Sequence, residues 1–181
     1  MIKINEIETP LGAMVAAATE EGLCMLAFSD QQRVKNFPEH LELFFGMSVC
    51  KGENKHLTQL SKQLNEYFSG TRIKFSIPLV TQGSQFQQEV WQGLLKIPFG
   101  STLSYRKQAE ALGKPGAARA VANANGRNRI SILIPCHRVT GSGGDLTGYS
   151  GGLKRKKWLL DHEKKYSGKT VELSLFQKNI F

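Results

Sequence analysis

The stretch Ile132-Leu-Ile-Pro-Cys-His-Arg-Val139 joins an apolar run to three chemically active side chains. The apolar run predicts a short buried segment, and Pro135 ends it because proline has a fixed φ and no backbone donor. Cys136 therefore stands at an element boundary, followed directly by His137 and Arg138. Cationic and histidine neighbours lower the pKa of a thiol, and the thiolate is its nucleophilic form. The stretch indicates a reactive cysteine, with a buried structural thiol as the plainer alternative.

Charge is distributed unevenly along the chain. Its 181 residues suit one domain or two small ones, and 40% of them are hydrophobic. Residues 1–100 hold 9 Lys/Arg against 10 Asp/Glu, whereas residues 101–181 hold 15 against 5. The net charge of +9 therefore comes from the C-terminal part. This asymmetry indicates a polyanion-binding half attached to a neutral one, although a basic surface that only aids solubility is the alternative.

Cysteine spacing and hydropathy bear on the compartment. Cys24, Cys50 and Cys136 are widely spaced and odd in number, which argues against a disulfide framework. No C-x-x-C or H-x-x-x-H pair occurs, so we expect no metal site, although one built from distant residues of the N-terminal part is left open. No apolar run approaches the roughly 20 residues of a membrane span, and the N-terminus lacks the apolar segment of a signal peptide. We therefore expect a cytoplasmic protein, or a nuclear one in a eukaryote, with no membrane partner.

Residues 1–82 have the pattern of a scaffold domain. Residues 1–29 alternate and turn twice, which predicts antiparallel strands of a small sheet. The pattern then predicts a weak helix, a loop, a helix and an edge strand at residues 30–45, 50–54, 56–69 and 73–79. None of these segments carries an obvious catalytic group.

Residues 83–166 have the pattern of a DNA-binding domain. Apolar spacing predicts helices over residues 86–96, 104–112 and 117–124. A short Gly-bearing turn joins the second helix to the third, which is rich in alanine and carries Arg119. This arrangement in a basic region is typical of a helix-turn-helix, with an ordinary three-helix bundle as the alternative.

The C-terminal 41 residues follow the cysteine stretch as a loop, a helix and an extension. The glycine-rich residues 141–152 predict a flexible pocket wall with Tyr149 as its one large side chain. Residues 153–166 predict an amphipathic helix with Trp158, Leu159 and Leu160 inward and Lys154–Lys157 in solvent. Residues 167–181 form an extension without an assigned role.

These residues together resemble the O6-alkylguanine-DNA alkyltransferases, also called methylated-DNA–protein-cysteine methyltransferases. The resemblance covers roughly residues 84–164 and is carried by Ser104-Tyr105, Ala117-Ala-Arg-Ala-Val121, Asn128, Ile132–Val139, Tyr149-Ser-Gly-Gly152 and Trp158-Leu-Leu-x-His-Glu163. It implies an α+β fold, in which an N-terminal α/β domain with a small antiparallel sheet (ribonuclease H-like) precedes a C-terminal winged helix-turn-helix domain with the cysteine. It also implies irreversible, single-turnover transfer of an alkyl group from O6 of guanine, or O4 of thymine, in double-stranded DNA to Cys136, without a cofactor.

The resemblance implies a role for each matching residue. Cys136 attacks as thiolate, His137 removes its proton through water, and Glu163 orients His137, as in a Cys–His–acid triad. The damaged base must be flipped out of the stack, so Arg119 is expected to fill its place and Tyr105 to crowd the rotating phosphate and donate a proton towards guanine N3. Asn128 is expected to hydrogen-bond near the cysteine and to order its loop. Further substrate or DNA contacts are expected from the carbonyls of Cys136 and Val139, Tyr149, Ser150, Gly151, Ala118, Ala120, Ser131, Arg127 and Arg129.

Two departures from the family pattern carry expectations. Ser131 stands where a proline often lines the pocket, so weaker stacking and poor reaction with O6-benzylguanine are expected. Arg127 and Arg129 make their loop more basic than the family pattern, which favours phosphate contacts.

Three rival functions remain open from the sequence. They are an alkyltransferase-like protein that binds lesions without transfer, a cysteine hydrolase and a transcription regulator. Relatives of the first kind lack the cysteine, which is present here as Cys136. We expect a monomer in solution, and cooperative binding to DNA is left open.

Overall fold

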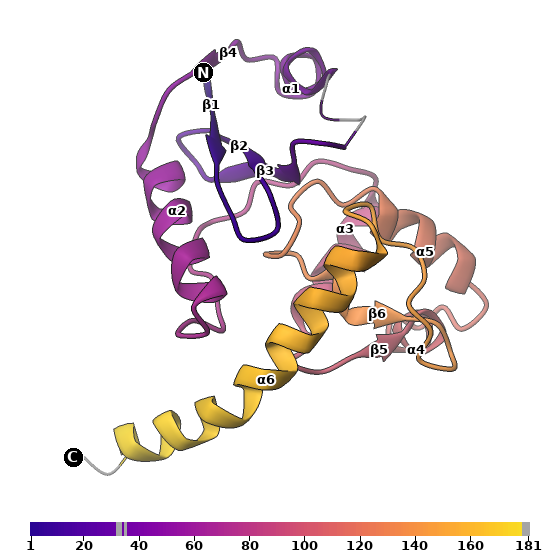
Figure 1. The fold of residues 1–181 in the computed structure, drawn as a ribbon. Coiled ribbons are helices and arrows are strands. Elements are labelled where there is room, and N and C mark those ends of the chain that lie inside the picture. The colour runs from indigo at the N-terminus through magenta and orange to yellow at the C-terminus, as the bar shows by residue number, and fades with distance from the viewer. Residues whose placement is uncertain (32–33, 35, 179–181) are drawn as a thin grey trace.

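The computed structural model describes residues 1–31, 34 and 36–178, with side chains described as far as residue 168. Figure 1 shows an N-terminal part built on a sheet and a C-terminal part built mainly of helices. In chain order the elements are β1 (Ile2–Ile7), β2 (Met14–Ala18), β3 (Leu23–Phe28), α1 (Phe37–Phe45), β4 (Val49–Lys51), α2 (Lys55–Phe68), α3 (Gln85–Leu95), β5 (Leu103–Ser104), α4 (Tyr105–Ala111), α5 (Ala118–Gly126), a 3-10 helix (Cys136–Arg138), β6 (Val139–Thr140) and α6 (Leu153–Lys178).

The N-terminal sheet has the strand order β3-β2-β1-β4. β1 pairs antiparallel with β2, and β2 with β3, which confirms the predicted antiparallel strands. β4 pairs parallel with β1, with Ile2 opposite Val49. The prediction of a loop from residue 50 was therefore wrong at Cys50 and Lys51. A three-residue edge strand has no alternation of its own to recognise, because only the backbone of β1 makes it a strand.

The predicted strand at residues 73–79 was also wrong. Only Leu79 in this segment forms a bridge, to Leu23, within the described residues. The carbonyl of Pro78 accepts from the amide of Leu23 at 2.9 Å, and the amide of Val80 donates to the carbonyl of Leu23 at 2.8 Å, but Pro78 has no amide with which to extend the pairing. The segment therefore meets β3 at one bridge without forming a ladder, while Ile77 is buried in the core.

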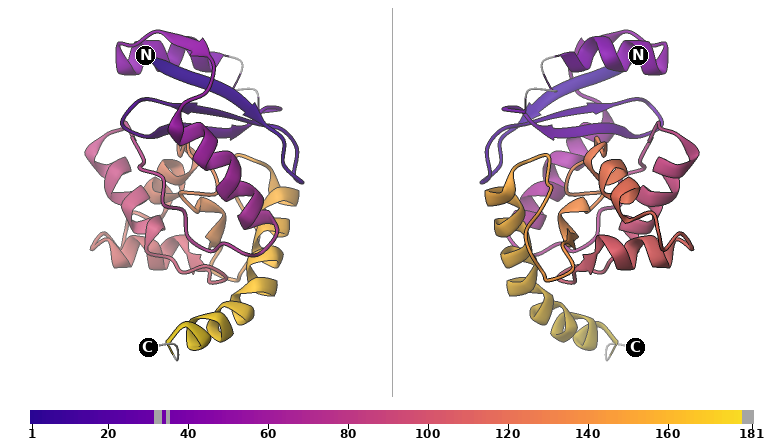
Figure 2. Two further views of the ribbon diagram at one scale, coloured as in Figure 1. Left: turned by 90° about the vertical axis from the view of Figure 1, so that its left-hand side faces the viewer. Right: turned by 90° about the vertical axis from the view of Figure 1, so that its right-hand side faces the viewer.

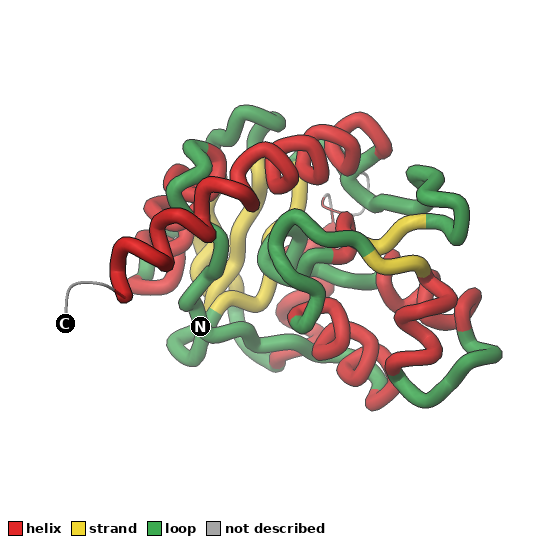
Figure 3. Tube along the Cα trace, turned by 90° about the horizontal axis from the view of Figure 1, so that it is seen from below, coloured by secondary structure: helices red, strands yellow, loops and turns green. Residues whose placement is uncertain are grey.

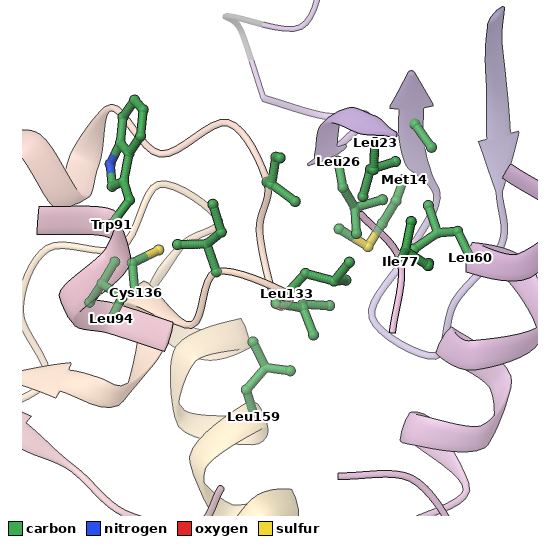
Figure 4. Close-up of a cluster of buried hydrophobic side chains, with 14 of the residues drawn as sticks. Met14, Leu23, Leu26, Leu60, Ile77, Trp91, Leu94, Leu133, Cys136 and Leu159 are labelled. Carbon is green, nitrogen blue, oxygen red and sulfur yellow. The ribbon is translucent and has the colours of Figure 1, made fainter. Parts of the chain in front are cut away.

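One apolar core passes from the sheet into the C-terminal part. Leu60 and Leu64 of α2 belong to the same buried cluster as Trp91 and Leu94 of α3 and Cys136. Figure 4 shows Leu133 between Cys136 and the side chains of the N-terminal sheet. The cysteine is therefore anchored against a core to which both parts of the chain contribute.

The C-terminal part contains the predicted helix-turn-helix. Ser84 begins α3 with a capping box to Gln87, and Ser104 accepts from the amide of Lys107 at the start of α4. α5 packs against both α4 and α3. β5 pairs in parallel with β6 directly after the cysteine helix, and Figure 3 shows the two sheets as separate groups of strands. The predicted helices are thus confirmed, with boundaries shifted by one or two residues.

The last helix differs from its prediction in length and in its buried face. α6 continues past residue 166 to Lys178, and Figure 2 shows its end extending away from the other elements. Lys156 is completely buried, so the prediction of a solvated Lys154–Lys157 face was wrong there, whereas Trp158, predicted inward, is 36% exposed. Within the described chain, α6 and the other helices all lack the length of apolar sequence that would cross a membrane.

Candidate active site

A tight turn presents Cys136 at the start of the 3-10 helix. Ile132 has a φ of 70°, which β-branched residues rarely adopt. The amide of Ile134 donates to the carbonyl of Ile130, and that of Cys136 to the carbonyl of Ile134. Cys136 is only 5% exposed. The backbone around the sulfur is therefore fixed by local hydrogen bonds and by burial of the preceding apolar residues.

Asn128 connects this turn to the sulfur. Its Oδ1 accepts from the amide of Ile130 at 2.9 Å, which fixes the orientation of the side-chain amide because a backbone N–H can only donate. Its Nδ2 then donates to the carbonyl of Ile134 at 2.9 Å and faces Sγ of Cys136 at 3.3 Å. A donor at that position favours a sulfur that carries negative charge.

Glu163 on α6 accepts hydrogen bonds from four residues in three segments of the chain. Its carboxylate lies 2.8 Å from His137 Nε2 and 2.8 Å from Arg138 Nε, and a second Arg138 nitrogen lies at 3.0 Å. The Tyr67 hydroxyl on α2 donates at 2.9 Å and the Gly100 amide at 3.1 Å. Burial acts to raise the pKa of Glu163, but His137 and Arg138 outweigh it and hold that pKa well below its ordinary value. Glu163 is therefore an ionised acceptor.

The ionised Glu163 determines the tautomer of His137. Because Glu163 can only accept, His137 donates from Nε2 and leaves Nδ1 as an acceptor. No residue among those described is hydrogen-bonded to Nδ1. Burial lowers the pKa of His137, against the opposing charge of Glu163. His137 is thus a neutral base with one nitrogen held and the other available.

Lys156 was not anticipated as part of the site. Its Nζ donates to the carbonyl of Val139 at 2.5 Å and to that of Thr147 at 2.6 Å. Burial lowers its pKa to about 8, while the charge of Cys136 acts to raise it. The sequence contained an indication that Lys156 faces inward. Leu159 and Glu163, three and seven residues further on, lie on the same helix face as Lys156.

The glycine-rich loop adjoins the cysteine. Tyr149 packs edge-on against the ring of His137, with the ring centres 6.3 Å apart. A side chain on Gly151 would meet the rings of Tyr149 and Phe28, so glycine is required between them. The hydroxyl of Tyr105 lies 3.2 Å from the Thr147 carbonyl and 3.1 Å from the Gly148 carbonyl. Burial and the charge of Cys136 raise the pKa of Tyr105. Ser150, half-buried, lies in the same loop.

Helix α5 presents a face on which Arg119 stands between small side chains. Arg119 and Ala120 are exposed and Ala118 is half-buried. Residues 111–144 contain no Asp or Glu, so no acidic side chain within this segment offsets its cations. At the other end of α5, Arg127 is exposed, and Arg129 lies over the ring of Phe44 with its guanidinium carbon 4.0 Å from the ring centre.

The structure thus brings Cys136, Asn128, His137 and Glu163 together, with Tyr105 and Tyr149 at the adjoining loop. Ser131 is completely buried, and its amide donates to Leu26 of β3. Tyr67 also belongs to this cluster and had no predicted role, and Arg138, expected beside the thiol, is paired with Glu163. No three His, Cys, Asp or Glu side chains within the described residues are grouped so as to hold a metal ion.

A thiol with an adjacent base, in a chain that also carries a helix-turn-helix, defines a DNA-binding protein with a nucleophilic cysteine. Two family models match the chain. The ribonuclease-like domain of 6-O-methylguanine DNA methyltransferase matches residues 2–81, and its DNA binding domain matches residues 85–165. The chain belongs to the 6-O-methylguanine DNA methyltransferase family.

Individual relatives resemble the chain over most of its length. The methylated-DNA–protein-cysteine methyltransferase of Mycobacterium leprae is 43% identical over 168 residues, covering 91% of this chain and 93% of the relative. The constitutive enzyme of that name from Bacillus subtilis is 41% identical, covering 87% and 92%. The crystal structure of the Mycobacterium tuberculosis O6-methylguanine methyltransferase has a TM-score of 0.79 at 39% identity, covering 92% and 94%. The Mycobacterium tuberculosis protein in complex with DNA has a TM-score of 0.78 at 39% identity, covering 91% and 93%.

Proposed function

We propose that this chain repairs DNA by transferring a methyl group from O6-methylguanine to Sγ of Cys136. The observation that carries the proposal is the chain of contacts around the sulfur. Asn128 faces Sγ at 3.3 Å, and the adjacent His137 is held at 2.8 Å by an ionised Glu163. This arrangement supplies both a base for the thiol proton and a donor for the thiolate.

The reaction follows from the charges in the site. His137 Nδ1 takes the thiol proton through a water molecule, and Asn128 and the Lys156 cation favour the resulting thiolate. Sγ then attacks the methyl carbon. The S–C bond forms as the C–O6 bond breaks, and the electron pair of that bond remains on O6. Tyr105 supplies a proton to the purine at N3, and the proton that His137 took from the thiol is returned to Tyr105 through solvent. The products are then neutral guanine and the methylated sulfur, with both side chains in their starting states.

Access to the methyl group requires base flipping. Extruding a nucleotide from a duplex costs a few kcal/mol, and less where pairing is already disturbed. Arg119 projects from a helix whose small side chains allow close approach, and it occupies the place of the flipped base. Ser150, Gly151 and Tyr149 enclose the base, and the carbonyls of Cys136 and Val139 accept from its exocyclic amine. Val139 retains acceptor capacity beside Lys156, because a carbonyl oxygen has two lone pairs.

The transfer is irreversible and stoichiometric. The product is a thioether, whose S–C bond water does not cleave at neutral pH, so each molecule acts once. O4-alkylthymine presents the same alkyl–oxygen bond and is a second substrate. A monomer suffices because Cys136, His137, Glu163 and Arg119 all come from one chain, and the cytoplasm, or the nucleus of a eukaryote, is the proposed compartment.

Nucleoside analysis of repaired DNA tests the proposal. Duplex containing O6-methylguanine is incubated with increasing protein, digested, and assayed for restored guanine. One guanine per protein molecule is expected, and none with Cys136→Ser, which should still bind the duplex. Binding by the wild type without restored guanine would support lesion recognition without transfer, and more than one guanine per molecule would contradict the stoichiometric mechanism.

A further inference from the structure

A groove of about 720 Å³ lies where the two parts of the chain meet, at the opposite end of α5 from Arg119. Its walls come from α1, from the first turns of α3 with the preceding linker, and from the loop after α5. The walls include Phe37, His40, Phe44, Trp91, Arg127 and Arg129. Among the described lining residues none is acidic, so the groove is suited to an anion.

Both arginines are disposed to meet a ligand. Arg127 is exposed, and no described side chain forms an ion pair or hydrogen bond with it. Arg129 lies over the ring of Phe44, which is itself 45% exposed. A cation held flat against an aromatic ring loses little rotational freedom on binding a phosphate. His40, one turn before Phe44 on α1, adds an exposed donor.

The groove continues the exposed face of α5. Arg119, Asn123 and Arg127 are all exposed and recur every fourth residue, so they form one stripe along the helix. Arg127 stands eight residues from Arg119, which corresponds to about 12 Å along the helix axis. At about 3.4 Å per base pair, this is the length of three to four base pairs of DNA. A strand that follows the stripe from Arg119 therefore reaches the groove.

We propose that this groove is a second DNA subsite, which binds the sugar–phosphate strand of the same duplex three to four base pairs from the flipped nucleotide. The inference rests on the proposed function, because Arg119 sets the register. Arg127 and Arg129 contact the phosphates and Phe44 contacts a sugar face. The N-terminal part thus contributes to DNA affinity through α1, in addition to supporting the core.

Truncated duplexes test the subsite. Binding is measured for duplexes with O6-methylguanine at the centre, or with only two base pairs on one side or the other. Truncation on the side that faces the groove should weaken binding by the wild type more than truncation on the opposite side. Arg127→Gln should remove this asymmetry and lower the salt slope of binding to the full duplex by about 0.9.

Control variants and a separate assay keep the result interpretable. Lys62→Gln removes an exposed cation from α2, outside the groove, and should retain the asymmetry. Methyl transfer from free O6-methylguanine base to the wild type tests the chemistry without a duplex, and its absence would count against the proposed function and not against the subsite. Equal sensitivity of the wild type to both truncations, or equal effects of Arg127→Gln and Lys62→Gln on the full duplex, would overturn the subsite.

Discussion

Tyr67→Phe tests whether the N-terminal part stabilises the catalytic carboxylate. Tyr67 on α2 is completely buried, and its hydroxyl donates to Glu163 across a separation of 96 residues. The substitution removes this donor and keeps the ring, which packs against Phe99 and His162 with centres 6.1 and 5.2 Å away. The effect should therefore come from one hydrogen bond and not from a cavity.

The expected magnitude follows from the charge of the acceptor. A hydrogen bond to a charged group contributes about 1.5–3 kcal/mol, and the lower part of this range applies because the same oxygen keeps His137 and Arg138 as donors. A loss of about 1.5–2 kcal/mol corresponds to a Tm lower by about 3–8 °C for a chain of this size. Glu163 stays ionised, so the rate of methyl transfer should change no more than a few-fold.

Urea unfolding of a double-mutant cycle with Glu163→Gln is the assay. A neutral amide acceptor makes the Tyr67 hydrogen bond worth about 1 kcal/mol or less, so the two substitutions should couple by about 1 kcal/mol. Equal losses from Tyr67→Phe in both backgrounds, or a loss below about 0.5 kcal/mol in the wild type, would refute the reasoning.

Three other predictions concern pH, charge and substrate size. The pKa of Glu163 and the pKa of His137 are both lowered in the folded state. The free energy of unfolding should therefore fall as the pH drops below 6.5, the ordinary pKa of His137, because the unfolded chain then binds a proton that the folded chain does not. It should fall further below pH 4.5, the ordinary pKa of Glu163, for the same reason. Urea titrations that show no loss between pH 7 and 4 would exclude this coupling. Lys156→Met should slow methyl transfer about tenfold, the equivalent of one pKa unit in the thiol, and single-turnover kinetics with an unchanged rate would show that the Lys156 cation does not assist Cys136. Labelling by O6-benzylguanine should be slow in the wild type, because Ser131 offers no ring for stacking, and rapid labelling would refute the role given to Ser131.

The elements of the C-terminal part were predictable because local signals define them. Ser84 and Ser104 begin helices by capping, and the Gly-bearing turn before α5 separates two short helices. The resemblance then selected Cys136, Asn128, His137 and Glu163 from among residues with plainer alternatives, and the structure brings these four together.

What the sequence did not reveal depends on contacts between distant residues. Tyr67 meets Glu163 only because α2 packs against α6, and no local pattern on α2 distinguishes its hydroxyl from that of an ordinary core tyrosine. Lys156 sits in a run of basic residues that resembles a solvated surface. β4 is a strand only because β1 provides an edge, and residues 73–79 alternate without forming a ladder because Pro78 lacks an amide.

Peptide mass mapping after reaction with O6-methylguanine duplex tests the central claim most directly. The peptide that contains Cys136 should gain one methyl group in every active molecule, while the peptides with Cys24 and Cys50 stay unchanged. The pKa of Cys24 is raised to about 12 by burial, so it should be inert and serves as an internal control. Repaired DNA with an unmodified Cys136 peptide, or methylation spread over the three cysteines, would contradict the assignment of Cys136 as the methyl acceptor.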